Sequence, residues 1–259
     1  MRLTRFGWSE LASAGAAAIT TASFASAADR ERLSFSVSPD KAGRSQTVRF
    51  SFDSTAPWST FGVSLTLPPG TVWNGGRFPR CSLRTLLRLG APRRAADGVP
   101  HACPRGSRVG SGRATIVHSN PGLTIRERGR VTAVNGGGTI HLVMRARSEL
   151  TVDGKRRQLS GSDVNVWRAA PSRLGRVTQW LPVGGPMEFP GDRVARLKHL
   201  DLAIGNTRKS RGILELGRCP TGRWRASVSV RYYDLAAEDE WRDAWRGTGR
   251  ATDSARCSA

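Results

Sequence analysis

Apolar and polar residues alternate along much of this chain, and the alternation predicts β-strands. It is clearest at 33–39 and 47–53, and again at 61–70, where Pro-Pro-Gly ends the run. A period of two places successive side chains on opposite faces, so these runs are typical of half-buried strands. Shorter strand-like runs follow at 114–118, 129–134, 139–146 and 226–233.

Two turn signals fall between or after these runs. The glycine-rich segment 135–138, Asn-Gly-Gly-Gly, separates the runs 129–134 and 139–146, and Val-Asp-Gly-Lys follows at 152–155. Glycine and Asn or Asp tolerate the backbone angles that tight turns require. We therefore expect a hairpin across 135–138 and a further turn at 152–155.

Only two stretches have the residue spacing of a helix. In 82–90, three leucines share one face and Gly90 supplies a C-terminal stop. In 236–247, Trp241 and Trp245 lie four residues apart, and acidic residues in the first turns suit a helix N-terminus. The first stretch predicts a short helix, and the second predicts either a helix or a structured loop between the last two strands.

Many short strands, frequent turns and little helix predict an all-β protein, an antiparallel β-sandwich with one short helix. The pattern does not separate one large sandwich from two tandem ones. If there are two, Pro-Gly-Leu-Thr at 121–124 is the expected seam. Since there is no repeat and no long low-complexity linker, we expect a single domain over 28–259.

The first 27 residues have the pattern of a secretory signal peptide. Arg2 and Arg5 precede a weakly apolar, alanine-rich stretch, and Ala25-Ser26-Ala27 matches the small-x-small pattern of a cleavage site. We expect cleavage after Ala27 and a secreted or cell-envelope location. The alternative is an alanine-rich leader that stays on the mature chain. No other stretch approaches the ~20 apolar residues of a membrane span, so we expect no transmembrane segment.

Four cysteines follow the leader, namely Cys81, Cys103, Cys219 and Cys257. An even number in an exported chain indicates disulfides, and three pairings are possible. We favour Cys81–Cys103 with Cys219–Cys257, because each pair closes a loop of moderate length.

The formal charge of +21 comes almost entirely from arginine. Of 41 basic residues only four are lysine, which leaves 37 arginines. They are spread along the chain, and the tightest runs, 93–94 and 155–157, are shorter than a typical nucleic-acid-binding arm. We therefore expect no dedicated nucleic-acid role, and interpret the arginines as a solvated sheet face able to bind anionic envelope polymers.

Motifs for metal or cofactor chemistry are missing from the sequence. Cys81, His101 and Cys103 lack the paired spacings of a structural zinc site. The glycine-rich segment 106–113 lacks the lysine and Ser/Thr of a phosphate-binding loop, and a strand rather than a helix follows it. We expect 106–113 to be a turn leading into the strand 114–118. We therefore expect no cofactor and no metal. Because a G-x-S-x-G motif is absent, we also expect that the fold is not that of an α/β-hydrolase.

Tryptophan is unusually common, with eight residues against two tyrosines. Trp224 begins a predicted strand, so we expect it in the core. Trp241 and Trp245, with Arg242 and Arg246 beside them, are the candidates for an exposed ligand-binding platform.

The same segment holds the chain's one acidic cluster. It consists of Asp234, Glu238, Asp239, Glu240 and Asp243. Its register does not match a calcium loop. A pair of these carboxylates defines the alternative function, an extracellular polysaccharide-active hydrolase. The simpler interpretation is an exposed segment that balances nearby arginines.

Two cysteine patterns resemble those of uncharacterised secreted β-proteins of high-GC actinobacteria. Residues 103–112 read Cys-Pro-x-x-Ser-x-Val-Gly-x-Gly after the upstream Cys81, and 219–224 read Cys-Pro-x-Gly-x-Trp before the aromatic stretch 231–234 and Cys257. The resemblance spans most of the mature chain and implies a disulfide-stapled, exported β-protein. It supplies no catalytic residues. This chain departs from the pattern after 231–234, where an acidic, tryptophan-bearing insertion replaces a short turn.

Together these features predict an exported, non-catalytic β-protein of the cell envelope or extracellular space. Its expected ligands are anionic or carbohydrate polymers, and the sequence leaves its oligomeric state open.

Overall fold

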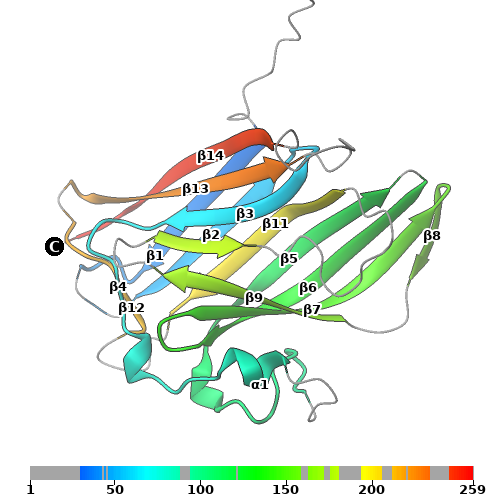
Figure 1. The fold of residues 1–259 in the computed structure, drawn as a ribbon. Helices are drawn as coiled ribbons and strands as arrows, with labels where there is room; N and C mark the ends of the chain where they lie inside the picture. Colours follow the sequence, from blue (N-terminus) through cyan, green and yellow to red (C-terminus); the bar gives the residue numbers. More distant parts are fainter. Residues whose placement is uncertain are drawn as a thin grey trace, which may run out of the picture.

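The computed structural model describes residues 30–42, 44, 46–87, 94–120, 122–158, 163–171, 176–180, 194–205, 212–219, 221–233 and 245–258. Most of these residues lie in β-strands (Figure 1). The strands are β1 (Glu31–Ser38), β2 (Thr47–Ser54), β3 (Ser59–Thr66), β4 (Val72–Trp73), β5 (Arg108–Asn120), β6 (Leu123–Asn135), β7 (Ile140–Val152), β8 (Lys155–Gln158), β9 (Asp163–Pro171), β10 (Arg176–Trp180), β11 (Val194–Ile204), β12 (Leu214–Glu215), β13 (Arg223–Tyr233) and β14 (Trp245–Arg256). The α-helix of the described part is α1 (Leu83–Leu87), and 3₁₀ turns occur at Gly75–Arg77 and Arg105–Ser107.

Within the described ranges, twelve strands form one antiparallel sheet. Its order is β1-β2-β11-β5-β6-β7-β9-β10-β3-β13-β14, and β8 pairs with the far end of β7. Strands β4 and β12 form a separate two-stranded sheet. The long hairpins β5–β6 and β6–β7 lie at the centre of this order, as Figure 1 shows.

The sheet bends back on itself to form the antiparallel β-sandwich that the sequence predicts. The strands at its two ends meet, because the backbone N–H of Phe35 in β1 donates to Asp253 Oδ2 in β14 over 2.7 Å. Further from the ends of the sheet order, the backbone N–H of Leu197 in β11 donates to Thr60 Oγ1 in β3 over 3.1 Å. These contacts join strands that are not neighbours in the sheet order, so the two layers enclose a common core.

The inward faces of the strands supply that core. In β2, Val48, Phe50 and Phe52 alternate with more exposed residues, as the period-two pattern predicts. The largest fully buried side chains include Trp224 and Tyr232 of β13. Trp224 therefore occupies the core position expected from the sequence, and its indole N–H donates to carbonyls at 217 and 218.

The hairpin and turn signals are confirmed. Asn135 faces Ile140 across the β6–β7 hairpin. Asp153 and Gly154, both with positive φ, make the turn between β7 and β8. At the suggested seam, Asn120 of β5 faces Leu123 of β6, so residues 122–124 continue a hairpin between neighbouring strands. The division into one or two domains stays a prediction.

The expected turn at 106–113 is wrong over 108–113, because β5 already begins at Arg108, and the turn is limited to the 3₁₀ segment Arg105–Ser107. Its glycines serve close strand packing instead. A Cβ on Gly112 would collide with the carbonyl oxygen of Asp201 in β11, and one on Gly110 would collide with that of Ala203. Glycine-rich sequence here permits a tight approach between neighbouring backbones.

The expected helix or loop at 236–247 is wrong over its last three residues. Trp245, Arg246 and Gly247 open β14, with Trp245 opposite Tyr233 of β13. Pairing with a long neighbouring strand outweighs the local helical spacing of the two tryptophans. The remainder, 236–244, lies outside the described residues.

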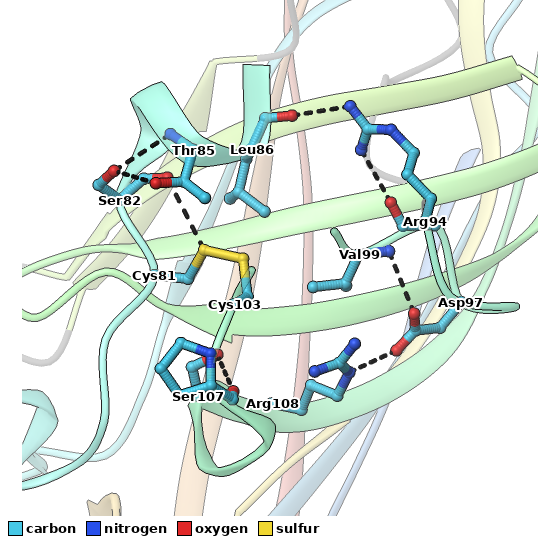
Figure 2. Close-up of a disulfide and its surroundings, with 12 residues drawn as sticks. Cys81, Ser82, Thr85, Leu86, Arg94, Asp97, Val99, Cys103, Ser107 and Arg108 are labelled. Carbon is cyan, nitrogen blue, oxygen red and sulfur yellow. Dashed lines mark hydrogen bonds and ion pairs between the residues drawn. A yellow bond between two sulfur atoms is a disulfide. The ribbon is translucent and has the colours of Figure 1, made fainter. Parts of the chain in front are cut away.

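A lobe made by residues 81–87 and 94–108 covers one end of the outer face of β6 and β7 (Figure 1). Its disulfide, Cys81–Cys103, has a Cα–Cα distance of 5.2 Å, and the two sulfurs lie beside α1 (Figure 2). Leu86 and Val99 pack with them on Val134 and Val143 of the sheet. This is the disulfide-linked helix that the sequence predicts, with 88–90 outside the described part.

Partly buried polar contacts hold the lobe in shape. Arg94 donates to the carbonyls of Leu86 and Gly98, and Asp97 Oδ2 accepts from Arg108 Nε over 2.6 Å (Figure 2). Because these bonds link the helix, the loop and the start of β5, the lobe has a defined position on the sheet.

The second disulfide, Cys219–Cys257, has a Cα–Cα distance of 5.9 Å and ties the end of β14 to the segment before β13. Both pairings match those favoured from loop length. Two disulfides indicate an oxidising compartment. None of the described helices is long and apolar enough to cross a membrane.

Candidate anion-binding surface

The ligand-binding residues expected from the sequence lie largely outside the described part of the chain. Trp241 and Arg242 are outside it, as are the acidic residues of 234–243. Trp245 and Arg246 are the first residues of β14, where only their backbone is described. A platform formed by these four residues therefore stays a prediction.

The structure instead gathers arginines on the outer face of β5, β6 and β7. We call this set the arginine grid; its members are Arg113, Arg128, Arg130, Arg145 and Arg147. Arg130 of β6 lies directly opposite Arg113 on one side and Arg145 on the other. One row further along, Arg128 faces Arg147. All five side chains are exposed.

The two facing pairs of the grid, Arg130–Arg145 and Arg128–Arg147, place like charges side by side. Directly opposite residues in an antiparallel pair have Cβ atoms about 4.5–5.5 Å apart, and like charges there destabilise the sheet. No carboxylate of the described residues lies within ion-pair distance of Arg128, Arg130 or Arg147. Two successive repulsive pairs concentrate positive charge where an anionic ligand would relieve it.

Acidic residues bound this charge on two sides. Asp201 of β11 lies opposite Arg113, and Glu149 of β7 lies opposite Arg126, one row beyond the Arg128–Arg147 pair. Glu149 also lies 3.7 Å from Arg156 Nε in β8. These two carboxylates thus flank the two facing pairs.

Small residues beneath the grid bring β6 and β7 close together. On the inner face, Gly129 lies between Ala114 of β5 and Ala146 of β7. A Cβ on Gly129 would lie 2.5 Å from the carbonyl oxygen of Arg145. The tight approach requires glycine here, and it fixes the spacing of the arginines on the opposite face.

The disulfide lobe positions one member of the grid. Arg145 Nη1 lies 3.3 Å from the carbonyl oxygen of Ala96, to which it donates. The Arg145 Cβ also lies close to Gly98, where an added Cβ would be only 3.3 Å away. The lobe therefore forms a wall beside the Arg130–Arg145 pair and orients the guanidinium of Arg145.

The outer face of β13 and β14 provides an internal comparison. It also exposes five arginines: Arg223, Arg225, Arg231, Arg250 and Arg256. There, only Arg223 and Arg256 face each other, whereas Arg225, Arg231 and Arg250 lie opposite serine or threonine. The same number of charges is therefore spread out on that face and concentrated in the grid.

A separate polar cluster lies where β1, β2 and β13 meet. Glu31 is only 5% exposed and accepts hydrogen bonds from Tyr232 Oη and Ser54 Oγ. Its other oxygen, Oε2, is buried without a hydrogen-bond partner among the described residues. Lys198 donates to the Ala56 carbonyl over 2.9 Å nearby.

Burial dominates the electrostatics of this cluster. It raises the pKa of the Glu31 carboxyl, an effect opposed by the hydrogen bonds from Tyr232 and Ser54 and by the charge of Lys198. Burial, followed by the hydrogen bond to Glu31, raises the pKa of Tyr232, and burial lowers that of Lys198. These shifts make the cluster a pH-sensitive element of stability.

Histidines and carboxylates are dispersed elsewhere in the described residues. His118 lies 3.8 Å from Glu127, and His199 Nδ1 lies 2.7 Å from Asp53 Oδ1. No group of three or more His, Cys, Asp or Glu side chains in the described ranges has the arrangement to hold a metal ion.

No protein-family model matches the chain, and the curated proteins contain no match to it. Its class is defined by fold and surface: an antiparallel β-sandwich with two disulfides and a concentrated arginine face.

The spacing of the arginines along the chain does not by itself reveal the grid. Arginines recur at every second position in 126–130 and 145–147, which places each set on one strand face. The hairpin signal at 135–138 fixes which residues face each other once Asn135 pairs with Ile140. Combining these two signals would have predicted both facing pairs.

Proposed function

We propose that this chain is an exported, non-catalytic β-protein of the cell envelope or extracellular space that binds anionic polymers through the arginine grid. The observation that carries the proposal is the two successive facing pairs, Arg130–Arg145 and Arg128–Arg147, whose like-charged side chains lie exposed side by side. Guanidinium groups bind phosphate and carboxylate oxygens through paired hydrogen bonds.

Binding rather than catalysis fits the chemistry of these side chains. Arginine stays protonated at any physiological pH and presents donors only, so it serves poorly as a nucleophile or a general base. The grid offers charge and hydrogen bonds on an open sheet face, which suits attachment to an extended polymer.

Export is supported by the two disulfides, which persist in oxidising compartments. We propose that residues 1–27 are removed during export. Mass spectrometry of the protein secreted by its host should then give a mature chain that starts at Ala28, and an unprocessed N-terminus in the exported protein would contradict this part of the proposal.

The binding test uses purified envelope polymers immobilised on beads and the mature, disulfide-intact chain. We expect retention at low salt that weakens by about sevenfold in affinity between about 50 and about 200 mM salt, because counterions are released on binding. A neutral glycan treated in parallel is the control. No retention on the anionic polymers at low salt would overturn the proposed function.

A further inference from the structure

The surroundings of the grid restrict how a polymer can lie on it. Toward β11, the row that contains Arg113 meets Asp201, which repels an anion. Toward β9, the row meets the lobe, where Gly98 packs between Arg145 and Val164. A polyanion that runs across the strands therefore encounters a carboxylate on one side and a wall on the other.

Along the strands the surroundings differ. At the lobe end, the outer-face residues Val134 and Val143 are fully buried beneath the lobe (Figure 2 shows the disulfide and Val99 above the sheet). At the opposite end, beyond the Arg128–Arg147 pair, Glu149 bounds the grid, but Arg126 faces it and Arg156 Nε lies 3.7 Å from it, so two arginines offset its charge. The favourable path follows β6 and β7 and ends against the lobe.

Strand geometry sets the distance between successive arginine pairs along this path. The two facing pairs are separated by two residues, or about 6.7 Å along a strand. Each pair brings two guanidinium groups toward the same point from adjacent strands. A tetrahedral phosphodiester presents its non-bridging oxygens in different directions and accepts from both groups, whereas a carboxylate presents its lone pairs in a single plane.

We infer that the ligand of the grid is a linear phosphodiester polymer that lies along β6 and β7, with two consecutive phosphates bound by the Arg130–Arg145 and Arg128–Arg147 pairs. This inference rests on the proposed function and specifies the ligand, its direction and its smallest recognised unit. The lobe closes the path at one end, so the bound segment terminates or turns away from the sheet there.

The first experiment localises binding. Affinity for poly(glycerol phosphate) is measured by calorimetry for the mature chain, for R128Q/R147Q and for the matched control R225Q/R231Q. The control removes the same charge from the outer face of β13. We expect about a tenfold or greater loss for R128Q/R147Q and less than about a threefold loss for the control. Circular dichroism and thermal melting verify that both variants fold.

Equal losses in the two variants would overturn the assignment of the site while leaving polyanion binding intact. Absence of binding by the unmodified chain to every anionic polymer tested would instead overturn the proposed function, so the two failures are distinguishable.

The second experiment tests the smallest unit and the chemistry. A monomer, a dimer and a tetramer of glycerol phosphate are compared, with polygalacturonate as the carboxylate polymer and single-stranded oligo(dT) as a phosphodiester with bases. We expect the largest step in affinity, about tenfold, between monomer and dimer. A uniform gain with each added phosphate would overturn the two-phosphate unit, and equal binding of polygalacturonate would overturn the phosphodiester preference. Tighter binding of oligo(dT) than of the glycerol phosphate polymer would reassign the ligand to nucleic acid.

Discussion

Arg147 and Arg128 face each other across β6 and β7, and the repulsion between them is a cost in stability that a binding role explains. At the scale of single residues, the charge of each side chain affects both the stability of the sheet and the affinity for the polymer. Glu149, only two positions further along β7, faces Arg126 and forms the opposite-charge arrangement that a purely structural sheet favours.

Replacing Arg147 with glutamate should therefore stabilise the protein while it weakens polymer binding. The new carboxylate faces Arg128, so we expect a gain of about 0.5–1 kcal/mol in the free energy of unfolding at low salt. Urea denaturation and binding to poly(glycerol phosphate) measure the two effects. If Arg147→Glu both destabilised the fold and bound as tightly as the original, the electrostatic interpretation of the facing pairs would be wrong.

Glu31 makes stability depend on pH in a direction set by its environment. Its folded-state pKa is raised by burial above the ordinary value of 4.5, so the folded protein holds the proton more tightly than the unfolded chain. The contribution to stability is complete below that ordinary value and is lost as pH rises through the raised pKa. Glu31→Gln should abolish this loss.

The measurement compares urea unfolding of the original chain and of Glu31→Gln from acidic to neutral pH. The difference in unfolding free energy should move in favour of the glutamine variant as pH increases. The exposed Asp153→Asn is the control for charge removal in general. A difference that stayed constant with pH would contradict a raised Glu31 pKa.

At the scale of elements, register turns dispersed residues into a site. The alternation in 129–134 and 139–146, together with the turn signal between them, predicts the β6–β7 hairpin correctly. It does not reveal the strand order beyond that hairpin, in which β5 lies between β6 and β11. Strand β11 was missed because its apolar residues, Leu197, Leu200 and Leu202, break the period of two at a bulge.

The errors at 106–113 and 245–247 have a common physical cause. Glycine-rich or helix-like local sequence was interpreted without the strand that would lie beside it. Gly112 is needed for the close approach of β11, and Trp245 is drawn into β14 by pairing with Tyr233. Such tertiary preferences are invisible in local propensity.

At Gly129, a side chain on β6 would collide with the backbone of β7. Gly129→Ala places a methyl group against the Arg145 backbone, and we expect a loss of about 1–3 kcal/mol in unfolding free energy together with weaker polymer binding. Gly138→Ala, in the adjacent hairpin turn, meets no atom within 4 Å and serves as the control. Equal stability of the two variants in urea would show that the close approach is unimportant.

At the scale of the whole molecule, two disulfides and a folded-over sheet present one concentrated positive face to solvent. The Cys81–Cys103 lobe contributes both stability and the wall beside Arg145. The serine double variant of this pair should lose about 3 kcal/mol of unfolding free energy. It should also bind poly(glycerol phosphate) more weakly, because Arg145 loses its orientation.

The same double substitution at Cys219 and Cys257 is the comparison for that experiment. It should cost a similar amount of stability, yet leave affinity unchanged under conditions where both variants are folded. Weaker binding in both variants would mean that the lobe has no specific part in the site.

The salt dependence of binding shows whether the arginine grid itself holds the polymer. With two phosphates neutralised by the two facing pairs, the slope of log affinity against log salt for a single-stranded polyanion should be about −1.4, and removing one pair by R128Q/R147Q should reduce its size to about −0.7. R225Q/R231Q should retain the original slope. Identical slopes in all three proteins would contradict the assignment of polymer binding to the arginine grid.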